Sequence, residues 1–120
     1  MNRIRKTKGF TLVEIMIVVL IIGILMAIAV PNFLKARQSS RQKTVIANLR
    51  QVDSAKEQWA METGQISGAG CVEGNLYPVY MKNYPLNTPV TGVYVPNAVG
   101  TDPDFLGKTA AQWAADPTGL

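Results

Sequence analysis

Few residues in this 120-residue chain are of a type that performs chemistry. The chain has no His and a single Cys, Cys71, which excludes an intrachain disulfide, most zinc sites and every histidine-based catalytic triad. We find no catalytic constellation, so we expect neither enzyme activity nor a bound cofactor. The remaining candidate is Glu14, the single charge among residues 10–30. A carboxylate inside an apolar membrane helix costs roughly 2.5–3.5 kcal/mol at the bilayer centre, so such a group is a functional candidate by default.

The segment that must position Glu14 is the apolar run of residues 10–30, whose composition predicts a membrane-spanning helix. As a helix its 21 residues would extend about 31 Å, the thickness of the hydrocarbon core of a bilayer. Four basic residues and no acid lie within residues 1–9. Because a basic segment stays on the cytoplasmic side during insertion, we expect one pass through the inner membrane with a cytoplasmic N-terminus.

The charge of the rest of the chain argues against nucleic acid as a partner. Four of the 12 basic residues lie within residues 1–9, and the other eight are balanced by eight acidic residues. The positive excess therefore belongs to the N-terminal segment and not to the body. Basic residues between Lys35 and Arg50 are expected to contact lipid headgroups and later the acids of a neighbouring copy, which are Asp53, Glu57 and Glu62.

Helical periodicity continues to residue 63, but the helix becomes amphipathic after residue 31. Apolar residues recur there at helical spacing and define one face, formed by Val45, Leu49, Val52, Ala55 and Trp59. Charged residues such as Lys56 are expected mainly elsewhere around the helix. Gly64 predicts the end of the helix, because glycine readily adopts the left-handed conformation found there.

Gly23 and Pro31 interrupt the pattern of this helix. Pro31 cannot donate a hydrogen bond to the carbonyl of Ala27, and a proline inside a helix costs about 3 kcal/mol. The two residues therefore predict either a mild kink or a segment that unwinds when helices pack together.

Residues 65–120 differ in composition and predict a small, loop-rich head. They contain six of the seven prolines and seven of the ten glycines, which excludes long regular elements. Residues 76–81 and 92–95 carry Tyr and Val and are predicted as short antiparallel strands. Thr109 and Gln112 match a capping box, which predicts a short helix that includes Trp113. The head is too small to bury a core of its own comfortably, so we expect it to pack on the apolar helix face in an α+β fold.

The residues from Lys8 to Glu14, together with the apolar run that follows, resemble the N-terminus of type IV prepilins and of the pseudopilins of type II secretion. The resemblance implies that a prepilin peptidase cuts after Gly9 and methylates the new N-terminal residue, Phe10. Gly9 has no side chain, so an extended segment around it fits a narrow protease site. Cleavage also creates a positive α-amino group on Phe10, which could pair with Glu14 of a neighbouring copy and set the axial register between helices.

The resemblance also implies an assembly. The chain would form a homo-oligomeric helical filament, periplasmic or extracellular, with the prepilin peptidase, an inner-membrane assembly platform and minor pilins as partners. The family has Gly and Pro at places that match Gly23 and Pro31, which favours local unwinding during assembly. The expected parts are a cleaved basic leader at residues 1–9, a membrane span and later filament core at residues 10–30, an amphipathic continuation at residues 31–63, and the pilin head at residues 64–120.

Three other interpretations remain open at this point. Residues 27–29 fit the small-x-small site of a secretory signal peptide, and cleavage after Ala29 would leave a soluble periplasmic protein. An uncut chain would be a static membrane protein in which the helix dipole favours Glu14. A DNA-uptake pilus would use the same N-terminus as the other filaments.

Asp102 and Asp104 raise the question of a metal site, because major pseudopilins of type II secretion can bind calcium in their C-terminal loops. Calcium takes about 6–8 oxygen ligands, and two carboxylates around a proline are explained more simply by turn formation. We therefore expect no metal site. Cys71 is interpreted as an idle small residue rather than a redox centre.

Overall fold

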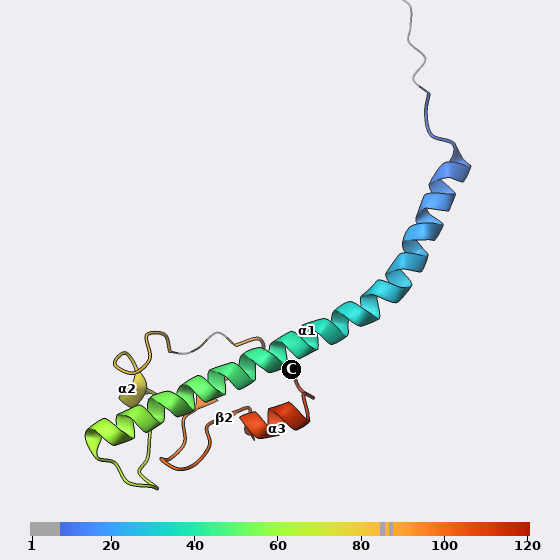
Figure 1. The fold of residues 1–120 in the computed structure, drawn as a ribbon. Coiled ribbons are helices and arrows are strands. Elements are labelled where there is room, and N and C mark those ends of the chain that lie inside the picture. The colour runs from blue at the N-terminus through green and yellow to red at the C-terminus, as the bar shows by residue number, and fades with distance from the viewer. Residues whose placement is uncertain (1–7, 85, 87) are drawn as a thin grey trace, which may run out of the picture. The chain divides into compact units, whose positions relative to one another are not determined.

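The computed structural model describes residues 8–84, 86 and 88–120, so the predicted leader lies mostly outside the described residues. It has an α+β fold, as the sequence predicts, with a long N-terminal helix and a small head (Figure 1). The chain divides into two compact units, one that ends at Ala36 and one from Arg37 to Leu120. The elements in order are α1 (Leu12–Thr63), α2 (Glu73–Leu76), β1 (Tyr94–Val95), β2 (Asp104–Phe105), β3 (Lys108–Thr109) and α3 (Ala110–Ala115).

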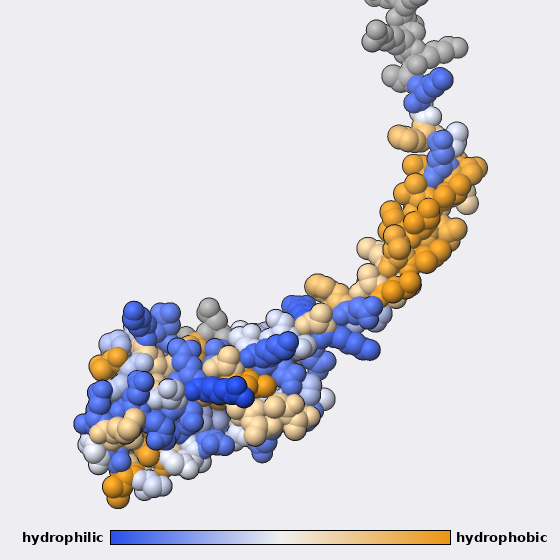
Figure 2. All heavy atoms as spheres, viewed as in Figure 1, coloured by the Kyte–Doolittle hydropathy of each residue, from blue (hydrophilic) through white to orange (hydrophobic). Residues whose placement is uncertain are grey.

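The first unit contains the N-terminal part of α1, and its apolar side chains are uncovered. Every residue from 8 to 36 is exposed, and Figure 2 shows the hydrophobic side chains grouped along this part of the helix. The described residues contain one helix that is long and apolar enough to cross a membrane, and it is α1. This surface requires a covering other than the chain itself.

Helix α1 passes through Gly23 and Pro31 without a break in the single chain. Only one backbone hydrogen bond is lost at Pro31, and neighbouring turns maintain the helix. Local unwinding in an assembled state remains a prediction.

The second unit is built on the predicted apolar face of α1. Val45, Leu49, Val52, Ala55 and Trp59 are all buried, which confirms the predicted stripe. The head packs on this face, as expected, and its contribution to the core is Cys71, Leu76, Met81, Tyr84, Tyr94, Val99, Phe105 and Trp113.

A three-stranded antiparallel sheet in the order β1-β2-β3 forms the centre of the head. Tyr94 pairs with Phe105 across β1 and β2, and their rings stack with centroids 4.6 Å apart. The indole Nε1 of Trp113 donates to the carbonyl of Phe105 at 3.0 Å, so α3 is fixed to the middle strand. The prediction of a strand within residues 92–95 is confirmed at β1.

The predicted strand at residues 76–81 is wrong. Helix α2 ends at Leu76, and residues 77–80 form turns in which the amides of Tyr80 and Met81 both donate to the carbonyl of Leu76. Leu76 and Met81 are buried at a spacing of five residues, which does not match the alternation of a strand. The Tyr and Val content that suggested a strand belongs to an exposed turn.

Both predicted helix boundaries in the second unit are confirmed. Helix α1 ends at Thr63, Gly64 has a φ of 68°, and the amide of Gln65 donates to the carbonyl of Ala60 at 2.9 Å, as in a Schellman motif. Helix α3 begins after Thr109, whose amide donates to Oε1 of Gln112 at 2.8 Å.

Lys56 corrects the expectation that the charged residues of α1 lie away from the core. Its side chain is completely buried, and its Nζ donates to the carbonyls of Pro96, at 3.2 Å, and Thr101. Asp53 lies 3.3 Å from the same nitrogen and supplies the opposite charge. A buried ammonium is tolerated only with such partners, so Lys56 attaches the loop of residues 96–101 to α1.

We expect Lys56→Met to lower the free energy of unfolding by roughly 2–4 kcal/mol, because two carbonyls lose their donor in a buried site. Thermal unfolding of the full chain in detergent, followed by circular dichroism, measures the change. The matched control is Lys43→Met on the exposed side of α1, which should stay within about 0.5 kcal/mol of the wild type. Equal stability of the two variants would contradict the role given to Lys56.

Tyr84 predicts a loss of stability at alkaline pH. Burial, and then the negative charges of Glu73 and Cys71, raise the pKa of its phenol from 10.0 to about 12, and the phenol donates to the carbonyl of Tyr94. A pKa that is raised on folding contributes stability below about pH 10 that is lost as the pH rises towards 12. In an ultraviolet titration of phenolate, Tyr84→Phe should remove one group from the late-titrating fraction, and an unchanged late fraction would contradict the assignment.

Candidate processing and assembly site

Helix α1 begins with a reciprocal pair of hydrogen bonds between Thr11 and Glu14. The backbone amide of Thr11 donates to Oε2 of Glu14 at 2.8 Å, and the backbone amide of Glu14 donates to Oγ1 of Thr11 at 3.2 Å. Thr11 directly precedes the first helical residue, Leu12, so Glu14 occupies the third helical position. This arrangement is a capping box, which satisfies two amides that lie outside the helical hydrogen-bond pattern.

The capping box places the Glu14 carboxylate at the N-terminal, positive end of the helix dipole. The bond to Thr11 uses one carboxylate oxygen, Oε2. Among the residues that the structure describes, the other oxygen, Oε1, has no hydrogen-bond partner. An ionised carboxylate accepts bonds on both oxygens, so Glu14 can bind a further donor without breaking the cap.

The peptide bond between Gly9 and Phe10 lies before the helix. Residues 8–11 have no regular secondary structure, and all four are exposed. The side chain of Phe10 is 86% exposed. This segment is therefore available to an enzyme that binds its substrate in an extended conformation.

Nothing in the fold requires glycine at position 9. A Cβ atom built on Gly9 meets no heavy atom within 4 Å, and the residue is not in the left-handed region. Gly64 in contrast has a positive φ that strains any other residue. The described fold therefore gives no reason for a glycine at position 9.

Sequence reasoning identified Gly9, Phe10 and Glu14 as site residues, but it missed Thr11. The signal was present, because Thr11 and Glu14 have the Thr-x-x-Glu spacing of a capping box directly before an apolar run. The structure brings Thr11 and Glu14 together. It leaves Gly23 and Pro31 further along α1, in about the fourth and sixth turns of the helix.

In the part of the chain that the structure describes, no group of three His, Cys, Asp or Glu side chains that could hold a metal ion occurs around Asp102 and Asp104 or elsewhere. Both oxygens of Asp104 are used locally, Oδ2 by the amide of Asn97 at 2.9 Å and Oδ1 by the backbone amide of Gly107 at 3.2 Å. Asp104 thus holds the turn before β3. Cys71 is buried, and burial raises the pKa of its thiol, which makes it a poor nucleophile.

We expect Thr11→Val to weaken the start of α1 by about 1 kcal/mol, because the amide of Glu14 loses its acceptor. Hydrogen exchange in detergent micelles should show faster exchange of the amides of residues 13–15, and Thr11→Ser should restore the wild-type rates. The matched control is Thr44→Val, since the hydroxyl of Thr44 donates to the carbonyl of Ser40 in mid-helix. Unchanged exchange in Thr11→Val would contradict the cap.

Comparison with known proteins locates the similarity in this N-terminal region. The family described as the prokaryotic N-terminal methylation motif matches residues 4–30. The chain is 45% identical over 62 residues to the type IV major pilin protein PilA of Myxococcus xanthus, a match that covers 52% of this chain and 28% of that protein. No solved structure matches the chain.

Two further relatives represent both kinds of filament system. The type II secretion system core protein G of Vibrio cholerae is 34% identical over 62 residues, which cover 52% of this chain and 42% of that protein. The type IV wide pilus major component PilA4 of Thermus thermophilus is 32% identical over 83 residues, which cover 69% of this chain and 61% of that protein. The chain thus spans less than two thirds of each of these relatives. The chain thus carries the prokaryotic N-terminal methylation motif, and over about half or more of its length it is similar to type IV pilins and to type II secretion core proteins G.

Proposed function

We propose that this chain is the precursor of a filament subunit that is cut between Gly9 and Phe10, methylated on the amine of Phe10 and polymerised through α1. The filament is a type IV pilus or a type II secretion pseudopilus. Before assembly the chain spans the inner membrane once with its N-terminus in the cytoplasm, and after assembly the filament is periplasmic or extracellular. Its partners are the prepilin peptidase, the inner-membrane assembly platform, minor pilins and further copies of itself.

The observation that carries the proposal is the combination of Gly9 with an exposed, non-helical segment. The fold has no use for a glycine at this position, whereas a protease site that encloses the substrate backbone does. The competing site after Ala29 lies inside the continuous helix α1, where cleavage would first require local unwinding. The geometry therefore favours processing at Gly9 over removal of a secretory signal peptide.

Cleavage changes the charge at the end of the helix. In the uncut chain the nitrogen of Phe10 is a neutral amide, and after cleavage it is a cationic amine, which remains cationic when methylated. The free Oε1 of Glu14 is an acceptor for such a donor from an adjacent copy. A carboxylate that accepts the bond from Thr11 and a charge-assisted bond from its neighbour is then fully satisfied in the apolar surroundings of the filament core.

The apolar surface of residues 10–34 supports polymerisation through α1. In the membrane, lipid covers these side chains, and in the filament other copies of α1 replace the lipid. Because lipid tails are as apolar as the side chains, this exchange depends on packing and on polar contacts between helices rather than on the hydrophobic effect. A charge pair at each interface is therefore suited to fix the register of the helices.

Mass spectrometry of filaments sheared from cells tests the processing. We expect a mature chain that begins at Phe10 and carries one methyl group on its α-amine. A mature chain that begins at Val30 would indicate a signal peptide, and a chain that retains residues 1–9 would indicate a static membrane protein. Either of these results would contradict the proposal.

We expect Glu14→Ala to leave cleavage at Gly9 intact but to abolish filaments, because the amine of Phe10 then has no partner in the filament core. Immunoblots of membrane fractions report cleavage, and electron microscopy of sheared material reports filaments. The matched control is Glu62→Ala, which removes an exposed acid of α1 in the second unit and should still assemble. Normal filaments from Glu14→Ala would contradict the charge-pair mechanism.

A further inference from the structure

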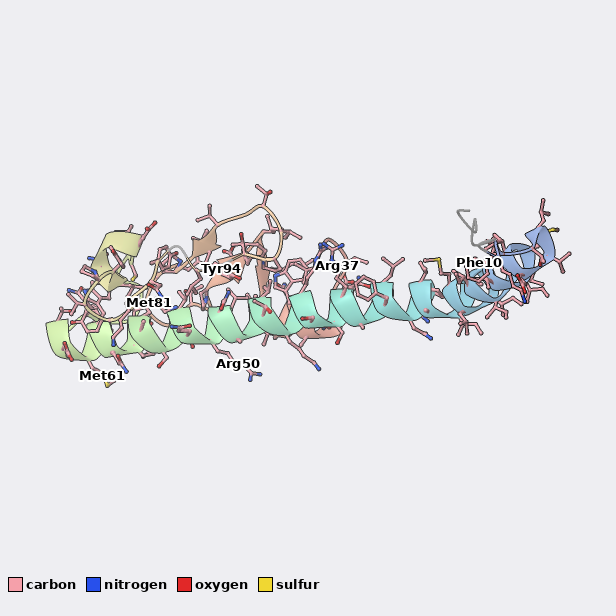
Figure 3. The ribbon with its side chains drawn as sticks, turned by 90° about the horizontal axis from the view of Figure 1, so that it is seen from above. Phe10, Arg37, Arg50, Met61, Met81 and Tyr94 are labelled. Atoms are coloured by element: carbon pink, nitrogen blue, oxygen red, sulfur yellow. The ribbon has the colours of Figure 1, made fainter. Side chains whose placement is uncertain are left out.

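The second half of α1 has a face that the head leaves uncovered. The head packs on the side of the helix that carries the buried stripe, and in Figure 3 Arg50 and Met61 project from the side of α1 opposite to Met81 and Tyr94. The exposed residues on this uncovered face, which recur at helical spacing, are Lys43, Ala47, Arg50, Ser54, Glu57 and Met61.

The structure separates the acids of this helix into those that are used within the chain and one that is not. Asp53 pairs with the buried Lys56 at 3.3 Å. Oε2 of Glu62 accepts a hydrogen bond from the hydroxyl of Tyr80 at 2.7 Å. Among the described residues, Glu57 has neither a hydrogen bond nor an ion pair, and it lies on the uncovered face. Of the three acids expected to meet a neighbouring copy, Glu57 is thus the one that has no partner within the described part of the chain.

Arg50 is a basic residue on the same face that, like Glu57, could pair with a neighbouring copy. It is exposed and, within the described part of the chain, makes no ion pair. It precedes Glu57 by seven residues, about two turns, so the two side chains lie along one line of the helix but about 10 Å apart. They cannot pair within one straight helix, but they can pair between two parallel helices that are shifted along their axes.

We propose that Arg50 of one copy pairs with Glu57 of the adjacent copy in the filament, and that this contact repeats at each subunit. The inference rests on the proposed function, because it requires parallel and staggered copies of α1. The partner of the uncovered face is then a second copy of this chain. Two arguments support this choice: the charges of Arg50 and Glu57 are complementary, and the contact needs a shift between helices in the same direction as the contact at the N-terminus.

The shared direction follows from the order of the charges. At the N-terminus the cation of Phe10 lies four residues before the acid Glu14, and in the second unit the cation of Arg50 lies seven residues before Glu57. Both pairs therefore need a shift in the same direction along α1. For Arg50 and Glu57, which lie within the helix, this shift is about 10 Å. A stagger in this direction is compatible with both contacts.

The surroundings of Arg50 suggest one rival within the chain. Arg50, Asp102, Pro103 and Ala111 border a groove of about 270 Å³ between α1 and α3. If Arg50 acted through Asp102, its role would be to close this groove in its own chain, and Glu57 would not matter. The two possibilities can be distinguished by reversing the charge of each acid. If Arg50 pairs with Glu57 of a neighbour, reversing Glu57 should have the same effect as reversing Arg50, and if Arg50 acts through Asp102, reversing Asp102 should have that effect.

A charge-swap experiment on the full-length protein in its own assembly system tests the proposal. The variants are Arg50→Glu, Glu57→Arg and the double variant, and the measurement is the yield of sheared filaments at equal amounts of subunit in the membrane. We expect each single variant to lose about fivefold or more in yield, because like charges then face each other at every interface. The double variant should recover to within about twofold of the wild type, because it restores the pair with the charges exchanged.

The control variant is Asp102→Arg, which reverses an exposed acid across the groove and should assemble like the wild type. Low yield in Asp102→Arg together with normal yield in Glu57→Arg would overturn the proposal in favour of the rival. Normal yield in both single variants would also overturn the pairing of Arg50 with Glu57. Wild-type filaments in the same experiment would then leave the proposed function unaffected. Absence of wild-type filaments that begin at Phe10 would instead refute the proposed function.

Cysteine cross-linking provides a second measurement that does not depend on yield. In a Cys71→Ser background, which removes the native thiol, Arg50→Cys combined with Glu57→Cys should give a ladder of disulfide-linked oligomers in oxidised filaments. The pair Lys43→Cys with Glu57→Cys, separated by twice the distance along α1, serves as the control and should give no such ladder. A ladder in the control alone, or in neither sample, would contradict the proposed stagger.

Discussion

The uncovered apolar surface of residues 10–34 is the constraint on which the rest of the structure depends. None of these residues is buried by the chain, and apolar surface of this extent is not stable in water. Lipid or other copies must cover it, so the first unit has no fold that is independent of its surroundings. The second unit, in contrast, buries one stripe of α1 against the sheet and α3.

Much of this arrangement follows from local patterns in the sequence. The buried stripe from Val45 to Trp59, the stop at Gly64 and the cap of α3 at Thr109 were all predicted correctly, because periodicity, left-handed glycine and capping are decided by residues close together in the chain. The α+β class followed from the contrast between one long periodic segment and a head rich in proline and glycine. The candidate processing and assembly residues Gly9, Phe10 and Glu14 could be proposed for the same reason, since they lie within six residues of one another, and their roles remain predictions.

The features that sequence reasoning missed are set by contacts between distant segments. Lys56 looked like a solvated charge, and only the folded loop supplies the carbonyls of Pro96 and Thr101 that make its burial possible. Residues 76–81 had the composition of a strand, but none of the strands in the described part of the chain pairs with them, and the amides of Tyr80 and Met81 donate to the carbonyl of Leu76 instead. Composition reports which conformation a segment favours, whereas pairing decides which one it adopts.

The charged groups of the chain fall into two classes: those that pair within the folded chain, and those whose partners would come from a neighbouring copy. Those that hold the fold are satisfied within the described chain, as Lys56 is by Asp53, and Lys108 by Asp116 at 3.0 Å. Glu14 is half satisfied, because the cap at Thr11 uses one of its two oxygens. Arg50 and Glu57 have no ion-pair partner among the described residues and lie on the face that the head does not cover. A subunit that first folds alone and later joins identical copies needs this division. An acid that is already paired within its own chain does not favour one stagger between neighbouring helices over another. The charges without a partner in the described chain would therefore set the register of an assembly. The packed core, whose groups already have partners, would not.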